Sequence, residues 1–151
     1  MTMAPKEDER SVRLIIESRL DNVFLLGLSV QAFCRSIPLD DVAAYQVELC
    51  VVEAVNNAIR HGYDSEPGHE VELIVSLHRG GITLRVCDGG RPLENMDNAD
   101  MNFDEEDLDS LPERGMGLFL IHTVMDEVSY ERLGGRNILT MSKFVHREGS
   151  G

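Results

Sequence analysis

Residues 48–62 hold an acid, an amide and an imidazole at a spacing that could support chemistry. Glu53, Asn57 and His61 follow one another at four-residue steps, so in a helix they lie along one face. The apolar residues in and around this segment recur at steps of three and four and occupy another face. They are Val47, Cys50, Val51, Ala54, Val55 and Ala58. Because a carboxylate beside an amide suits a base next to an oxygen ligand, Glu53 and Asn57 indicate a magnesium–phosphate site.

Asp88 ends a predicted strand and is followed by Gly89 and Gly90. A carboxylate in this place can accept a hydrogen bond from an exocyclic amine, and glycines let a flat ring approach the backbone. An Asp-Gly pair after a strand is also a very common turn, and taken alone Asp88 fits that structural interpretation better.

Gly115 and Gly117 open a predicted helix, where unpaired N–H groups and the helix dipole attract phosphate. A single Gly-x-Gly is a weak signal that also fits a glycine-rich loop end. Residues 91–114 form a long acidic segment without clear periodicity between Asp88 and these glycines. Such a segment has the right size for a lid over a bound ligand, and it also fits a solvated acidic linker.

The elements that must position these residues follow from the apolar pattern of the chain. Their predicted order is strand 11–18, helix 21–35, helix 40–62, hairpin strands 70–78 and 82–88, helix 115–125, and hairpin strands 128–133 and 137–145. Gly62 is expected to cap the second helix at its C-terminal end. The residues expected to point inward from the first helix are Phe24, Leu25, Leu28, Ala32 and Phe33.

This order of elements predicts an α/β fold, a two-layer sandwich. We expect a mixed, mostly antiparallel sheet that is covered on one face by helices. One domain would span residues 11–146, between flexible ends at residues 1–10 and 147–151.

The composition limits the classes of function. The 151-residue chain is long enough for one domain with a real core, and its formal net charge is −13. That charge, without a cluster of Lys or Arg, argues against nucleic acid as a partner. No apolar run is long enough to span a membrane and no signal peptide is evident, so a cytoplasmic protein is expected. Cys34, Cys50 and Cys87 lie in apolar contexts without metal-site spacing, which predicts reduced, buried thiols.

Four features follow one another along the chain. They are Glu53-x-x-x-Asn57, Asp88-x-Gly90-x-Pro92, the acidic segment and Gly115-x-Gly117-Leu118. Their order resembles the GHKL, or Bergerat-fold, ATP-binding superfamily, which includes gyrases, histidine kinases and mismatch-repair proteins. More narrowly, residues 53–63 and 114–121 look like the bacterial anti-sigma factor serine kinases of the sporulation and general-stress pathways. The resemblance extends from the first strand to Val145, and the motifs are specific as a set although each alone is weak.

The resemblance implies a role for each motif residue. Glu53 would be the general base that polarises an attacking hydroxyl, and Asn57 would coordinate a Mg²⁺ ion that bridges the phosphates of ATP. Asp88 would contact the adenine amino group, with Gly90 leaving room for the ring. The residues at the phosphates would be Gly115, Gly117 and Leu118, beneath a lid formed by residues 91–114. Phosphoryl transfer needs positioning and charge neutralisation more than covalent help, which suits this layout. His61 is expected to be a structural helix end without a catalytic role.

The resemblance implies a serine/threonine protein kinase that phosphorylates a STAS-type anti-sigma factor antagonist. Such a protein would also sequester a sigma factor or another regulator, and it would form a homodimer. An alternative is an ATP-binding module that switches partners with little kinase turnover. The catalytic domain of a two-component histidine kinase is disfavoured, because no histidine precedes His61 to serve as phosphoacceptor. A structural or DNA-topology protein would need a transducer domain, for which we expect the chain to be too short.

Overall fold

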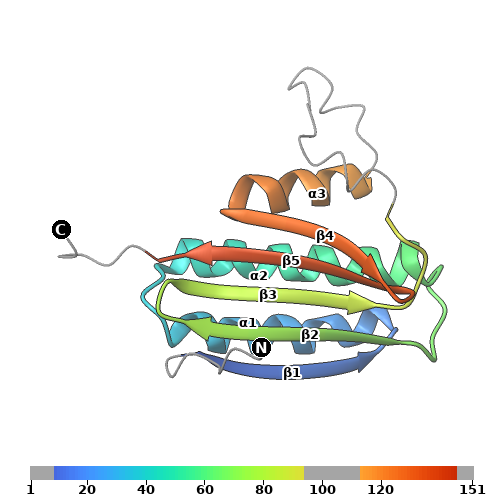
Figure 1. Ribbon diagram of the computed structural model, residues 1–151, viewed down its shortest axis with the longest axis horizontal. Helices are drawn as coiled ribbons and strands as arrows, with labels where there is room; N and C mark the ends of the chain where they lie inside the picture. Colours follow the sequence, from blue (N-terminus) through green and yellow to red (C-terminus); the bar gives the residue numbers. More distant parts are fainter. Residues whose placement is uncertain (1–8, 94–112, 146–151) are drawn as a thin grey trace, which may run out of the picture.

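The computed structural model describes residues 9–93 and 113–145, in which helices cover one face of a sheet (Figure 1). The strands are β1 (Arg10–Glu17), β2 (Glu70–His78), β3 (Gly81–Asp88), β4 (Glu127–Leu133) and β5 (Arg136–Phe144). The helices are α1 (Val23–Arg35), α2 (Asp41–Asn57) and α3 (Glu113–Val124), with a 3-10 turn at Leu20–Asn22 and a π-helical turn at Ala58–Gly62. Each predicted helix and strand is therefore present, close to its expected ends.

The sheet has the strand order β1-β2-β3-β5-β4, and every neighbouring pair is antiparallel. Short turns join β2 to β3 and β4 to β5, and in the second turn Gly134 and Gly135 both have positive φ. Only glycine adopts such a conformation without a steric penalty, so this Gly-Gly pair fixes the second hairpin. The predicted two-layer α/β sandwich is confirmed, with antiparallel pairing throughout the described strands.

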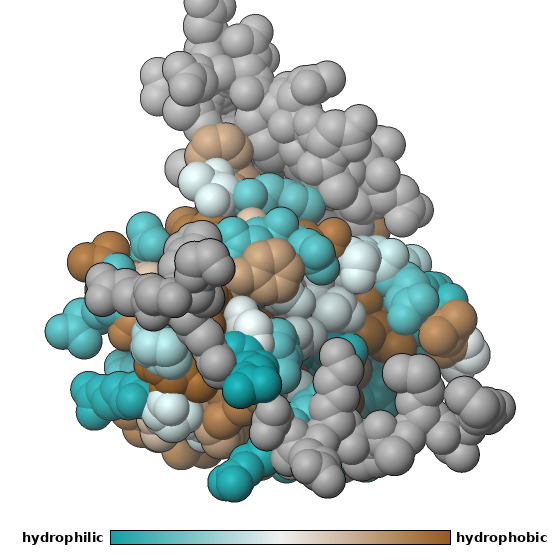
Figure 2. All heavy atoms as spheres, turned by 60° about the vertical axis from the view of Figure 1, so that its left-hand side comes forward, coloured by the Kyte–Doolittle hydropathy of each residue, from teal (hydrophilic) through white to brown (hydrophobic). Residues whose placement is uncertain are grey.

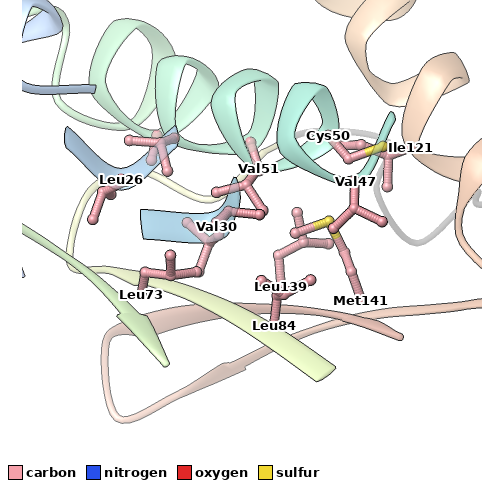
Figure 3. Packing of buried hydrophobic residues seen from close by; sticks show 14 of the residues in the cluster. Leu26, Val30, Val47, Cys50, Val51, Leu73, Leu84, Ile121, Leu139 and Met141 are labelled. Atoms are coloured by element: carbon pink, nitrogen blue, oxygen red, sulfur yellow. The ribbon is translucent and has the colours of Figure 1, made fainter. Parts of the chain in front are cut away.

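The core lies between the sheet and the helices, where α2 packs between α1 and α3 (Figure 1). In Figure 3, side chains from the sheet meet side chains from all three helices. The labelled residues are Leu73, Leu84, Leu139 and Met141 of the sheet, Leu26 and Val30 of α1, Val47, Cys50 and Val51 of α2, and Ile121 of α3. Full burial of one large apolar side chain of this kind stabilises the fold by about 1.5–3 kcal/mol.

The inward face of α1 differs from the prediction. Phe24, Leu25 and Leu28 were expected inside, yet they are 60%, 46% and 55% exposed. Ala32 is exposed as well, and Phe33 is only partly buried. The residues that α1 buries are Val23, Leu26, Gly27, Val30 and Cys34. Because α1 carries apolar residues on nearly every side, the periodicity of its sequence does not decide which face points inward.

Packing against α2 decides the orientation of α1. A Cβ built on Gly27 would lie 3.4 Å from Oε2 of Glu48 and 3.4 Å from Cγ2 of Val52. The missing side chain lets the two helices approach closely, so the smaller residues of α1 face inward. Phe24, Leu25 and Leu28 remain outside and form an exposed apolar group that we call the α1 strip. On the face shown in Figure 2, hydrophobic side chains also reach the surface in several places among hydrophilic ones.

Buried thiols are present as predicted. Cys34, Cys50 and Cys87 are all free and buried. Burial raises the pKa of Cys34 to about 11 and that of Cys50 to about 12, so these thiols stay protonated at neutral pH. Among the residues that the structure describes, no helix is both long and apolar enough to cross a membrane.

A buried carboxylate ties three strands together on the sheet face that points away from the helices. Glu72 of β2 is 6% exposed and accepts hydrogen bonds of 2.9 and 2.6 Å from Arg13 of β1. It also accepts a hydrogen bond from Arg136 of β5. Burial alone would raise the pKa of Glu72, but the hydrogen bonds and charges of both arginines outweigh it and hold the pKa below its usual value.

We expect Glu72→Gln to lower the free energy of unfolding at pH 7 by about 1–2 kcal/mol, because the amide lacks the charge that both arginines bind. The stabilisation by ionised Glu72 is complete above the pKa of an unfolded glutamate and is lost as the pH falls through the depressed folded pKa. Urea unfolding of both proteins at pH 7 and at about pH 3 measures this dependence. The difference should shrink in acid, and an equal difference at both pH values would contradict the assignment.

Candidate functional site

Helix α2 supplies the acid and the amide of the candidate site. Asp40 caps its first turn, because Oδ1 accepts a hydrogen bond of 2.7 Å from the backbone N–H of Ala43. The helix is regular to Asn57 and continues as a single π-helical turn over Ala58–Gly62. Such turns are rare and occur frequently at functional sites. Asn57, at the junction, is 4% exposed, and Glu53 is half-buried one turn earlier.

Gly117 of α3 brings the second glycine motif against this part of α2. A Cβ built on Gly117 would lie 2.7 Å from Oε2 of Glu53 and 3.5 Å from Nδ2 of Asn57. Any larger residue would push the Glu53 carboxylate aside, so the three residues form one contact although they are distant in the sequence. Leu118, the next residue, is 7% exposed and packs in the core.

The start of α3 differs from the predicted helix start. The helix begins at Glu113, before the predicted start at Gly115, so both Gly115 and Gly117 lie within its first turns. The first four N–H groups of a helix lack partners within the helix, and Gly115 belongs to these while Gly117 follows them. Each glycine weakens the helix by about 1 kcal/mol, but packing of α3 against α2 compensates for this loss.

Asp88, at the end of β3, is held by β5 and by its own turn. The register of the two strands places Asp88 opposite Asn137, which is 1% exposed. Nδ2 of Asn137 donates hydrogen bonds to Oδ1 of Asp88 at 3.0 Å and to the carbonyl oxygen of Gly90 at 2.9 Å. The Gly90 N–H also donates to Oδ1 of Asp88, at 2.9 Å. Burial raises the pKa of Asp88, and the hydrogen bonds from Asn137 and Gly90 oppose that rise.

Asn137 is a site residue that the sequence analysis did not identify. Its Oδ1 accepts a hydrogen bond of 2.6 Å from Arg132, which also donates to the carbonyl oxygen of Gly90 at 3.1 Å. Both ends of the amide are therefore engaged, which fixes its orientation. In the sequence, Asn137 is only the first polar residue of a strand, and the β3–β5 register is the signal that would have paired it with Asp88.

Gly62 and Gly90 form a backbone contact between the π-helical turn and the loop after β3. A Cβ built on Gly90 would lie 2.5 Å from the carbonyl carbon and oxygen of Gly62. The backbone N–H of Arg91 donates a hydrogen bond of 2.8 Å to the same carbonyl oxygen. A Cβ on Gly62 would in turn lie 3.2 Å from Oδ1 of Asp88. Glycine is therefore required at position 90, and a side chain at position 62 would crowd the Asp88 carboxylate.

The predicted role of Gly62 as a left-handed C-cap is wrong. Its φ is not positive, and the positive φ values nearby belong to Asp64 at 53° and Ser65 at 61°. The π-helical turn closes instead with a hydrogen bond of 3.0 Å from the Tyr63 N–H to the carbonyl oxygen of Ala58. A Cβ at position 62 would crowd the Asp88 carboxylate, a tertiary contact that no local sequence pattern reveals.

Other expectations fall partly outside the described residues. Of the predicted lid, residues 94–112 lie outside the described ranges, as do residues 1–8 and 146–151 at the two ends. Arg10, expected in the flexible N-terminus, already belongs to β1. His61 is half-buried within the π-helical turn, and its expected structural role stays a prediction.

Comparison with known proteins gives a family match over most of the chain. Residues 16–143 match the family described as histidine kinase-like ATPase domain. Proteins named serine-protein kinase RsbW, from Bacillus thuringiensis, Bacillus cereus and Bacillus anthracis, are 29% identical over 142 residues. These alignments cover 91% of this chain and 86% of each relative.

Solved structures share the fold. The RsbU and RsbW domains of a Mycobacterium tuberculosis protein match with a TM-score of 0.65 at 14% identity, over 91% of this chain and 33% of that chain. A chain of the SiaB–SiaC complex from Pseudomonas aeruginosa matches with a TM-score of 0.54 at 16% identity, over 87% and 89% of the two chains. The motifs, the fold and the family match agree, and the chain belongs to the histidine kinase-like ATPase domain family, in which it is similar to bacterial serine-protein kinases.

Proposed function

We propose that this protein is a serine/threonine protein kinase that binds Mg-ATP and phosphorylates a STAS-type anti-sigma factor antagonist. It would also hold a sigma factor or another regulator, and so switch partners in the cytoplasm. The observation that carries the proposal is the contact of Gly117 with Glu53 and Asn57, which sets an acid and a buried amide beside a helix start. Similarity to proteins named serine-protein kinase supports the reaction, and the likeness in fold to a protein solved as a SiaB–SiaC complex supports a protein partner.

The adenine end of the nucleotide would lie at Asp88. Asn137 and the Gly90 N–H both donate to Oδ1, so we assign Oδ2 as the acceptor for the adenine amino group. Within the part of the chain that the structure describes, the buried amide and the backbone N–H hold the carboxylate, and no cationic side chain bonds to it directly. In this arrangement the orientation of Asp88 is fixed while its capacity to accept a further hydrogen bond is kept.

The phosphate end would lie along α2 and the start of α3. The Asn57 amide would coordinate Mg²⁺, the unpaired N–H of Gly115 would face the phosphates, and the backbone of Gly117 and Leu118 would lie beside them. Within the described ranges, no group of three or more His, Cys, Asp or Glu side chains could hold a metal ion by itself. This fits Mg²⁺, which commonly takes most of its ligands from nucleotide phosphates and water. When bound, the ion would neutralise phosphate charge during transfer.

Glu53 would act as the general base. Its carboxylate would take the proton of a serine or threonine hydroxyl on the partner as that oxygen bonds to the γ-phosphorus. The bond from the γ-phosphorus to the bridging oxygen breaks in the same step, and ADP leaves. Glu53 is half-buried, so it is shielded on the side of α3 while a partner side chain can still approach.

We expect Glu53→Gln to reduce kcat for phosphorylation of a co-encoded STAS protein by about 10²–10⁴-fold, because the amide cannot take the proton. Affinity for ADP should stay close to that of the parent protein. Phosphoserine or phosphothreonine detected by mass spectrometry measures transfer, and calorimetry measures binding.

A matched control for Glu53→Gln is Glu48→Gln, which removes another carboxylate of the same helix. Oε1 of Glu48 accepts a hydrogen bond of 2.7 Å from Nε2 of Gln31. Transfer that is unchanged in Glu53→Gln would remove Glu53 from the mechanism. ATP binding by the parent protein, with no transfer to any STAS partner, would instead favour the partner-switching module without kinase turnover.

We expect ATP affinity to fall in mild acid. Asp88 must be ionised to accept from the adenine amino group, and its raised pKa means that protonation begins at a higher pH than for an ordinary aspartate. Binding should therefore be strong above this pKa and weaken as the pH drops through it. Asp88→Asn should bind about tenfold more weakly at neutral pH and lose the pH dependence. Calorimetry between about pH 5 and pH 8 tests this, and an unchanged profile in Asp88→Asn would assign the dependence to another group.

We propose further that the protein is a homodimer and that the α1 strip lies in the interface. The residues of α1 include no acid, whereas the chain as a whole carries a charge of −13 that makes two copies repel each other. Exposed apolar groups of this kind commonly mark a protein interface.

Phe24→Glu should give a monomer by multi-angle light scattering. Val42→Glu, at an apolar position of α2 that is 68% exposed, is the matched control and should leave the dimer intact. A parent protein that is monomeric would refute the proposal.

A further inference from the structure

The segment from Gly62 to Glu70, between the π-helical turn and β2, touches the Asp88 loop at several points. The backbone contact of Gly62 with Gly90 is one of them. A second is an ion pair between Arg91 and Asp64, a residue whose φ of 53° lies in the left-handed region. The next residue, Ser65, has a φ of 61°. Two consecutive non-glycine residues in this region are strained, and such strain is common where a structure clamps a ligand.

Tyr63 is the residue of this segment that contacts the Asp88 loop most directly. Its ring is 9% exposed, and its hydroxyl group makes two hydrogen bonds. The hydroxyl donates to the carbonyl oxygen of Glu70 at 2.7 Å and accepts from the backbone N–H of Gly89 at 2.7 Å. One phenol oxygen therefore joins the end of α2, the start of β2 and the residue that directly follows Asp88.

The Tyr63 ring is itself held in place by His69. It stacks on His69 with ring centroids 4.5 Å apart and an angle of 5° between the planes. Ser18, which is 1% exposed, fixes the backbone of His69: its N–H donates to the His69 carbonyl oxygen at 2.8 Å, and its Oγ accepts from the His69 N–H at 3.1 Å. The position of the phenol oxygen is thus determined by the sheet edge rather than by the loop that it contacts.

The Gly89 N–H belongs to the peptide plane that follows Asp88, so the bond to Tyr63 sets the orientation of the Asp88 backbone. Asn137, on the neighbouring strand, fixes the orientation of the Asp88 carboxylate. We propose that Tyr63 is a positioning residue that aims the Asp88 carboxylate and thereby determines selectivity for adenine over guanine. This inference rests on the proposed ATP site. Guanine carries a carbonyl oxygen where adenine carries its amino group, so a rigidly aimed carboxylate rejects guanine by placing two acceptors face to face.

The test is binding of ADP and GDP to the parent protein and to Tyr63→Phe, measured by calorimetry. The variant keeps the ring that stacks on His69 and loses only the hydroxyl group. We expect ADP to bind about tenfold more weakly, with little change for GDP, so that the ratio of the two affinities falls by the same factor. Tyr45→Phe is the matched control, because Tyr45 is 58% exposed on α2, and it should leave both affinities unchanged.

Tyr63→Phe could weaken the affinities for ADP and GDP equally, or change neither. In both cases the selectivity would be unchanged, and the inference would be overturned. A parent protein that binds neither nucleotide would overturn the proposed function and this inference together. If Tyr63→Phe does not fold, His69→Ala decides the question. This variant keeps the hydroxyl group of Tyr63 but removes the imidazole ring on which Tyr63 stacks. The ratio of the ADP and GDP affinities should therefore fall as well, by a smaller factor. Unchanged selectivity in His69→Ala would then refute the role of Tyr63.

Discussion

Gly62 and Gly90 bring the helix layer and the sheet layer into backbone contact at one corner of the molecule, and the candidate site depends on this contact. In a two-layer sandwich the layers are normally kept about 10 Å apart by side chains. Here the end of α2 and the loop after β3 meet without intervening side chains, and the Arg91 N–H closes the gap by donating to Gly62. The contact places the Asp88 carboxylate beside Gly62, at the end of the π-helical turn that continues α2.

The second consequence of this geometry is electrostatic. A carboxylate moved out of water needs hydrogen bonds, and among residues 9–93 and 113–145 Asp88 receives them from an amide and a backbone N–H rather than from a guanidinium group. Arg132 donates to the Asn137 amide and to the Gly90 carbonyl oxygen instead. A direct ion pair would lower the pKa and saturate the carboxylate. Burial raises the pKa of Asp88, and the hydrogen bonds from Asn137 and Gly90 both reach Oδ1 rather than Oδ2.

Local sequence patterns predicted the elements well, because alternation, helical periodicity and Gly-Gly turns are properties of short segments. The same patterns brought Glu53 and Asn57 to one face of a helix. They failed where tertiary contacts decide: α1 faces inward through Gly27 rather than Phe24, and Gly62 serves a contact between loops rather than a helix cap. Asn137 and Tyr63 were not predicted as site residues for the same reason. The partner of Asn137 is defined by strand register, and that of Tyr63 by a loop that returns to the sheet.

The two ends of the candidate site are built by different physical means. The Asp88 end is fixed by hydrogen bonds from three directions, through Asn137, Tyr63 and the Gly90 N–H. The Glu53 end, which we propose binds phosphate, is formed by the close approach of Gly117 to α2, near the start of a helix that two glycines weaken. That end therefore depends on the packing of α3 against α2 rather than on the intrinsic stability of the helix. In the proposed partner switch, the hydrogen bonds at Asp88 would hold the base in one position, and the packing of α3 on α2 would set the geometry at the phosphates.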